Sequence, residues 1–270
     1  LIVEKKMLEA AYLGLDAKIK EALQIAHDRV WFYHERQLEA FGSGINWSYE
    51  DDQGNVLGQH VRGMERVGIY VPGGKAAYPS TVIMTAIPAR VAGVREIIVC
   101  VPAPRGVCNK TVLAAAHLCG VDRVFSIGGA QAIAALAFGT NLVPKVDKIV
   151  GPGNEYVALA KKEVSGISGI DMFAGPSEVT VVADKFSKPE WVSADLIAQS
   201  EHDEMSQSIL VTNSKDLILK VNKSIKKQLK FLPKRMIASK SLKNFGLAIL
   251  LNNLKEAGKV CLLYTSDAAD

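Results

Sequence analysis

VGIYVPGG, at residues 67–74, is the stretch that decides the fold. A short run rich in β-branched and aromatic residues ends in a proline and two glycines, and a helical segment follows. The same order of strand, glycine turn and helix returns at Gly128-Gly129 and at Gly151-Pro-Gly153. This alternation predicts an α/β fold, with a mostly parallel sheet and helices on both of its faces.

The rest of the chain extends this pattern in both directions. Apolar residues at helical spacing predict a helix within residues 11–37, and residues 41–63, richer in Gly, Asn and Asp, predict loops and short strands. Further strands are predicted at residues 96–101, 123–127, 148–150, 178–183 and 209–212, and further helices at residues 78–91, 111–118, 130–138, 154–164 and 190–202.

Composition excludes several classes of protein. The 270 residues are 49% hydrophobic and 22% charged, which is enough apolar material for a core and excludes a disordered chain. The four cysteines form no CxxC pair, so neither a disulfide framework nor a zinc finger is indicated, and a reducing compartment is expected. No apolar run reaches the roughly 18 residues of a membrane span.

The net charge of +4 comes mostly from residues 215–243. Apolar residues recur there at a spacing of four, which favours an amphipathic helix with a solvated lysine face. The alternative is a surface that binds nucleic acid, although interleaved aromatic residues, which would stack on bases, are missing.

The three glycine turns predict a ligand at the edge of the sheet. In open α/β sheets, ligands bind outside the carboxyl ends of the strands, and helix N-termini favour anions. None of the turns is a GxGxxG, so the usual dinucleotide fingerprint is absent. The other interpretation is that these glycines only make tight turns.

Two further groups could carry chemistry. Gln199 and His202 are three residues apart, so on a helix they share one face and could form half of a metal site. By spacing alone, a polar surface pair is the simpler interpretation. Ser177 precedes a strand without a GxSxG elbow, which indicates a turn residue rather than a nucleophile.

Five segments together resemble the histidinol dehydrogenase family, in the same order and at nearly the same spacing. They are residues 68–74, 128–140, 144–154, 171–178 and 199–202. The resemblance implies two incomplete Rossmann-like domains: a discontinuous one of residues 1–66 plus 175–258, and a second of residues 67–174. It also implies a homodimer that oxidises L-histidinol through L-histidinal to L-histidine with NAD and zinc, in a bacterial cytoplasm or a plastid.

The resemblance also implies roles for particular residues. Tyr70, Gln131 and Asn154 would contact NAD, each beside one of the glycine turns. Ser177, Gln199 and His202 would bind the substrate, and Gln199 and His202 would also be zinc ligands.

The family's general base, a histidine in a Pro-Glu-His segment, has no counterpart in this sequence. Residues 259–270 do not align with the family, and we interpret them as an out-of-frame or adapter-derived tail. We therefore expect a fragment that lacks both termini, contains no catalytic residue and is inactive alone. An alternative enzyme class is an aldehyde-type dehydrogenase, with Cys100 or Cys108 as the nucleophile.

Overall fold

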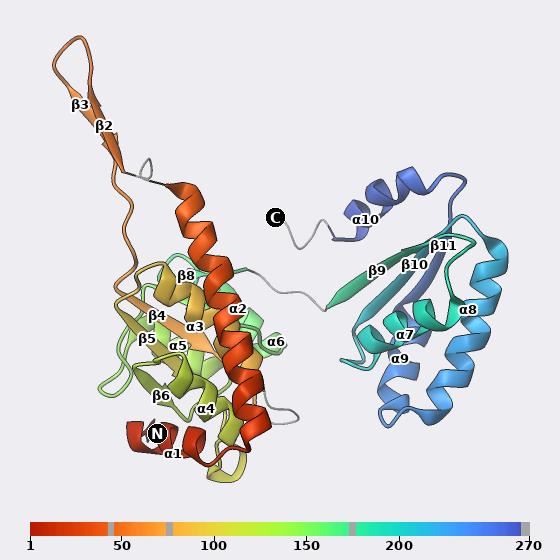
Figure 1. Cartoon of the computed structure of the whole chain (residues 1–270), viewed down its shortest axis with the longest axis horizontal. Coiled ribbons are helices and arrows are strands. Elements are labelled where there is room, and N and C mark those ends of the chain that lie inside the picture. Colours follow the sequence, from red (N-terminus) through yellow and green to blue (C-terminus); the bar gives the residue numbers. More distant parts are fainter. Residues whose placement is uncertain (43–45, 74–77, 173–176, 266–270) are drawn as a thin grey trace. The chain divides into compact units, whose positions relative to one another are not determined.

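The computed structural model describes residues 1–42, 46–73, 78–172 and 177–265. The chain divides into two compact units, Leu1–Phe173 and Ala174–Asp270, and each is described by itself (Figure 1). Of the motifs quoted above, Gly74 and residues 173–176 lie outside the described residues. No helix among those described has both the length and the apolar character needed to cross a membrane.

The first unit contains a six-stranded sheet in the order β1-β6-β5-β4-β7-β8. The five strands from β4 to β8 are mutually parallel, and β1 pairs antiparallel with β6. The chain moves outward from β4 in one direction and then returns to β4's other side, which is a doubly wound topology. The strands are β1 (Ile2–Val3), β4 (Arg66–Tyr70), β5 (Glu96–Cys100), β6 (Arg123–Phe125), β7 (Lys148–Val150) and β8 (Gly169–Ile170).

Alternation along the strands builds two cores. Val67, Ile69 and Val71 pack in the core formed with α1 to α4, whereas Tyr70 belongs to the opposite core formed with α5 and α6. Successive side chains of a strand point to opposite faces, so both faces of this sheet are covered as predicted. The helices are α1 (Lys5–Leu13), α2 (Ala17–Phe41), α3 (Pro79–Val91), α4 (Lys110–Leu118), α5 (Ala130–Phe138) and α6 (Glu155–Val164).

The N-terminal region differs from the prediction in two ways. The predicted helix is divided, because α1 ends before Gly14 and the Asp16 side chain accepts a hydrogen bond from the Lys18 N–H at 2.9 Å to start α2. α1 packs on α4 and α2 on α3, so residues 1–66 belong with the first unit rather than with residues 175–258. The exposed hairpin β2 (Trp47–Glu50) and β3 (Val56–Gln59) extends beyond the rest of this unit (Figure 1).

The second unit is a smaller α/β layer. Its parallel sheet has the order β11-β10-β9, in which β11 was not predicted. α7 and α8 pack on one face through Leu210, and α10 packs on the other through Ile209 and Val211. The elements are β9 (Glu178–Ala183), α7 (Pro189–Ser200), β10 (Gln207–Thr212), α8 (Lys215–Gln228), α9 (Arg235–Phe245), β11 (Gly246–Leu250) and α10 (Ala257–Thr265).

Candidate functional site

Tyr70 joins two of the glycine turns at the carboxyl edge of the first sheet. It ends β4, the strand at which the strand order reverses, and its side chain is buried. Its hydroxyl accepts a hydrogen bond from the Gly129 N–H at 3.1 Å. Its backbone oxygen lies 2.1 Å from the position that a Cβ on Gly151 would take. The reversal point between β4 and β7 is where ligands bind in folds of this kind.

Gln131 and Asn154 lie at the same edge. Gln131 is the second residue of α5, and its Oε1 lies 2.8 Å from the place of a Cβ on Gly129, so its exposed side chain covers that turn. Asn154 caps α6, because its Oδ1 accepts from the Val157 N–H at 3.1 Å. The structure therefore brings the turns of the three residues predicted to contact NAD to one edge of one sheet.

Part of the glycine content has a packing explanation. A Cβ on Gly128 would lie 2.3 Å from Pro102 Cγ, and one on Gly73 would lie 2.8 Å from the Pro102 oxygen. Both turns pack against the same proline, so a side chain at either glycine would force that turn away from Pro102. Close packing against Pro102 therefore accounts for Gly73 and Gly128, whether or not a ligand binds beside them.

An ion pair between the buried Lys161 and Asp171, beside Gly151, was missed by the sequence analysis. Lys161 is only 4% exposed, and its Nζ pairs with Asp171 and donates to the Gly151 oxygen at 2.9 Å. The sequence held one signal of this, since Lys161 follows Val157 by four residues and precedes Val164 by three. That spacing places the lysine on the buried face of α6.

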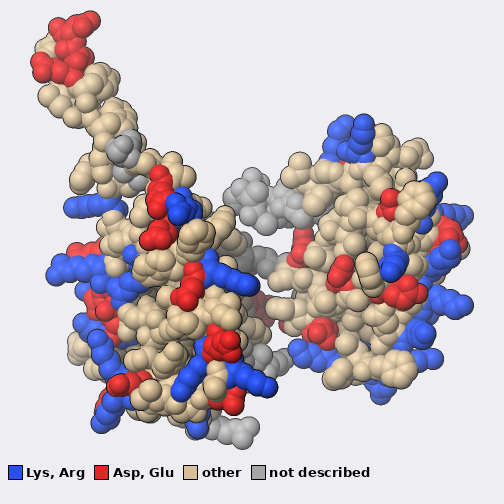
Figure 2. Space-filling view, in the orientation of Figure 1, with Lys and Arg blue, Asp and Glu red and all other residues tan. Residues whose placement is uncertain are grey.

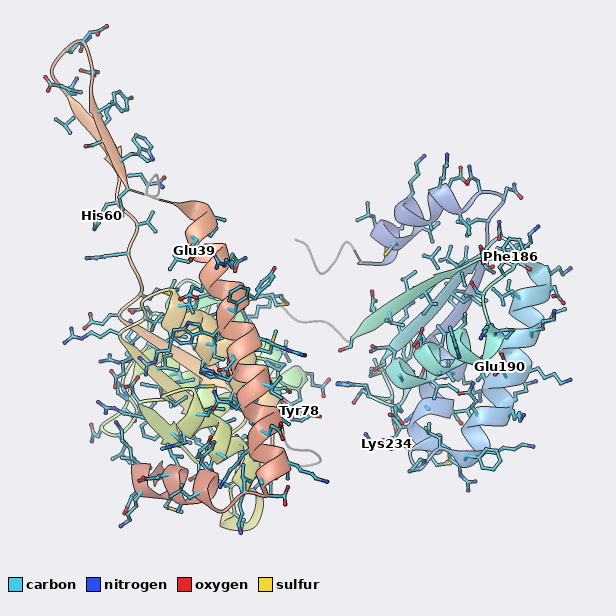
Figure 3. The ribbon with its side chains drawn as sticks, in the orientation of Figure 1. Glu39, His60, Tyr78, Phe186, Glu190 and Lys234 are labelled. Atoms are coloured by element: carbon cyan, nitrogen blue, oxygen red, sulfur yellow. The ribbon has the colours of Figure 1, made fainter. Side chains whose placement is uncertain are left out.

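In the second unit, the predicted substrate and metal residues come together at the amino edge of the sheet. α7 begins beside Glu190 (Figure 3) and runs back to the amino ends of β9 and β10. The Gln199 Nε2 donates to the Ser177 backbone oxygen at 3.1 Å, and the Gln207 N–H donates to the same oxygen at 3.1 Å. Ser177 thus joins the end of α7 to the start of the sheet.

His202 lies just beyond α7, which ends at Ser200 rather than at residue 202 as predicted. Its backbone N–H donates to the Gln199 backbone oxygen at 3.2 Å, and its side chain is exposed. Because the Gln199 Nε2 donates to the Ser177 backbone oxygen, the Gln199 Oε1 is the side-chain atom that could bind a metal ion. Amide oxygen and imidazole nitrogen are both donors that zinc accepts. Within the described ranges, no group of three His, Cys, Asp or Glu residues forms a metal site.

The structure argues against a cysteine nucleophile. Cys100 is fully buried, and desolvation raises the pKa of its thiol to about 12. Cys108 is half-buried, and desolvation raises its pKa as well. A nucleophilic cysteine needs a lowered pKa and access to substrate, and neither residue has both.

Native-state alkylation should therefore leave Cys100 and Cys119 unmodified. Burial raises both pKa values to about 12, so at pH 8 only about one thiol in ten thousand is ionised, and ionisation rises only as the pH approaches 12. Mass spectrometry after iodoacetamide treatment should find both thiols free in the native protein and labelled in denaturant. Rapid labelling of native Cys100 would restore the nucleophile interpretation.

A charged cavity lies at the opposite edge of the first sheet. It has a volume of about 560 Å³ and is lined by the amino ends of β4, β5 and β6. Glu96 accepts from Arg66 at 2.5 Å and pairs with Arg123 at 2.8 Å. The charges that line this cavity largely neutralise one another, so they tie the strand ends together and do not define a ligand.

The lysines of α8 behave as a solvated face. Leu217 and Val221 are buried on one side of the helix, whereas Lys223 and Lys227 are exposed on the other. On the face of this unit that Figure 2 shows, acidic side chains lie among the basic ones. This arrangement favours the amphipathic helix over a nucleic-acid surface.

The first unit is a doubly wound α/β fold, and its glycine turns lie at the sheet edge where nucleotide-binding enzymes bind their ligands. A family model described as histidinol dehydrogenase matches residues 1–267. The chain therefore belongs to the histidinol dehydrogenase family, as the resemblance of its motifs indicated. The matched range includes residues 259–267, which the motifs alone do not align with the family.

Individual relatives agree with this assignment. The chain is 54% identical over 260 residues to histidinol dehydrogenase from Chromobacterium violaceum, a match that covers 96% of this chain and 59% of the relative. It is 54% identical over 257 residues to that of Dechloromonas aromatica, covering 95% and 58%. The crystal structure of histidinol dehydrogenase from Elizabethkingia anophelis superposes with a TM-score of 0.89 at 36% identity, over 98% of this chain and 60% of that one. The chain thus spans less than two thirds of these relatives.

Proposed function

We propose that the whole protein oxidises L-histidinol through L-histidinal to L-histidine, with NAD and zinc, as a homodimer in a bacterial cytoplasm. The observation that carries the proposal is the family match over residues 1–267, supported by relatives named as this enzyme. NAD would supply the hydride acceptor, and zinc would supply a Lewis acid that orients the substrate.

The carboxyl edge of the first unit fits a nicotinamide cofactor. α5 and α6 both begin there, and their N-termini favour the negative charge of a pyrophosphate. Gln131 and the amide N–H groups of Asn154 are exposed beside these N-termini, so they are available as hydrogen-bond donors. Tyr70 is buried, and we propose that it shapes the pocket while its hydroxyl holds Gly129.

The amino edge of the second unit fits part of a zinc site. Gln199 is oriented by its bond to the Ser177 oxygen, and the His202 ring is exposed beside it. We propose that Gln199 and His202 ligate zinc, and that Ser177, Gln199 and His202 bind the substrate. A zinc site takes about four ligands. We propose that the further ligands and the general base lie in the part of the full-length enzyme that this chain does not span.

Activity assays can test this proposal on two chains. With histidinol, NAD and zinc, the full-length protein should form two NADH for each histidinol consumed. The 270-residue chain should be close to inactive, because a missing general base costs about 10²–10⁴-fold in rate. If the full-length protein forms no NADH that depends on histidinol, the proposed function is wrong. If the 270-residue chain alone turns over at the full rate, the expectation of an inactive fragment is wrong.

A Gln131→Ala substitution should weaken NAD binding about fivefold or more and leave bound zinc unchanged. The reason is that Gln131 lies at the turn of the first unit, whereas the proposed zinc ligands belong to the second. A lost hydrogen bond to a ligand is worth roughly 1 kcal/mol or more. Titration with NAD and metal analysis would measure both effects. Gln53→Ala, in the exposed hairpin turn, is the control and should change neither.

A further inference from the structure

Lys161 carries a charge in the interior of the first unit. It lies in α6, and its side chain is 4% exposed. A buried ammonium is unfavourable unless it is paired and hydrogen-bonded, and Lys161 satisfies this with two acceptors. They are the Asp171 carboxylate and the Gly151 backbone oxygen, the latter at 2.9 Å.

Asp171 completes the arrangement from the other side. Its Oδ2 accepts from the Gly151 N–H at 2.8 Å, and its Oδ1, besides pairing with Lys161, accepts from the Met172 N–H at 2.8 Å. Both polar backbone groups of Gly151 are therefore bound, one by each partner of the ion pair. We call Gly151, Lys161 and Asp171 the Gly151 clamp.

The clamp fixes one end of a short loop, residues 151–154, and α6 fixes the other end. At the far end, Asn154 bonds to the Val157 N–H, and a Cβ on Gly153 would lie 2.3 Å from Val157 Cγ1. Along its side, the loop lies against the Tyr70 oxygen. The peptide planes of the loop are thus set before any ligand arrives.

We propose that Lys161 and Asp171 are positioning residues, which hold the loop of residues 151–154 in the conformation that binds NAD. This inference rests on the proposed function, because that function places NAD at Asn154. A loop ordered in advance binds its ligand without the entropic cost of ordering. Loss of the clamp should therefore weaken NAD binding more than it changes the rate of the chemical step.

The free protein offers a test that needs no ligand. In Lys161→Met, amide hydrogen exchange at Gly151 should be at least about tenfold faster, while amides of β5 keep their protection. Lys162→Met is the matched control, because Lys162 is the exposed neighbour on the same helix. It should exchange like the unmodified protein. Unchanged exchange at Gly151 in Lys161→Met would overturn the clamp.

NAD titration of the full-length protein then separates the two proposals. Lys161→Met should raise the Kd for NAD by about tenfold or more, with the kcat at saturating NAD and the zinc content largely kept. An unmodified protein that binds no NAD would refute the proposed function, while the exchange result still decides the clamp. Faster exchange at Gly151 with an unchanged Kd would refute the positioning role.

A second variant guards against misfolding. Asp171→Asn alone leaves the Lys161 ammonium buried without its counter-charge, which is more damaging than removing both charges. The double variant Lys161→Met with Asp171→Asn should therefore recover the thermal stability lost in Asp171→Asn. The double variant should still bind NAD weakly. If the ion pair only stabilised the fold, NAD binding would recover together with the stability.

Discussion

Gly151→Ala is expected to destabilise the first unit by about 3 kcal/mol or more. The residue has a φ of +111°, a conformation that L side chains rarely adopt and that costs of order 1–3 kcal/mol. The added Cβ would also lie 2.1 Å from the Tyr70 backbone oxygen. A backbone atom in a strand cannot rotate away as a flexible side chain can, so β4 and β7 would have to separate at their ends.

Gly166→Ala provides the matched control for this effect. Gly166 also has a positive φ, of +94°, but no atom lies within 4 Å of its added Cβ. It should therefore lose less stability than Gly151→Ala, because only the cost of the backbone conformation, of order 1–3 kcal/mol, applies. Denaturant unfolding of both variants would measure the difference. Equal destabilisation would show that the close approach of Gly151 to Tyr70 does not exist in solution.

Much of the first unit's fold was predictable because its signals are local. The run from Val67 to Val71 alternates residues for two cores, and each glycine turn marks where a strand stops. Periodicity could not show that α1 and α2 are separate helices, because the break depends on the cap made by Asp16. It also missed β11, whose residues Gly246–Leu250 are mostly exposed and have no alternation of buried positions.

The sequence indicated candidate site residues, whose roles stay predictions, and it could not indicate the contacts that hold them. Gln199 and His202 came from a motif, and spacing alone placed them on one helix. The structure ends that helix at Ser200 and places His202 in the turn that follows. The bond from Gln199 to the Ser177 oxygen spans 22 residues, and the pair of Lys161 and Asp171 spans 10. Such contacts depend on tertiary packing, which no local pattern records.

In the full-length protein, His202→Asn is expected to lower turnover by more than about 100-fold and to reduce bound zinc. Removing a direct ligand should exceed the roughly 10–100-fold cost of altering a group behind one. The His202 side chain is exposed and has no hydrogen-bond partner among the described residues, so its replacement should leave the fold unchanged. Metal analysis, turnover with histidinol and circular dichroism would measure the three quantities.

His60→Asn is the control, because His60 is an exposed histidine at the foot of the β2–β3 hairpin (Figure 3). It should keep its zinc and its turnover. His202 is a cleaner test of the metal role than Gln199, since Gln199→Ala would also remove the bond to the Ser177 oxygen that ties α7 to the sheet. A His202→Asn protein with its full zinc content would remove His202 from the proposed ligands. Of the two proposed ligands, only the Gln199 Oε1 would then remain. The proposal that this edge of the sheet binds zinc would be refuted.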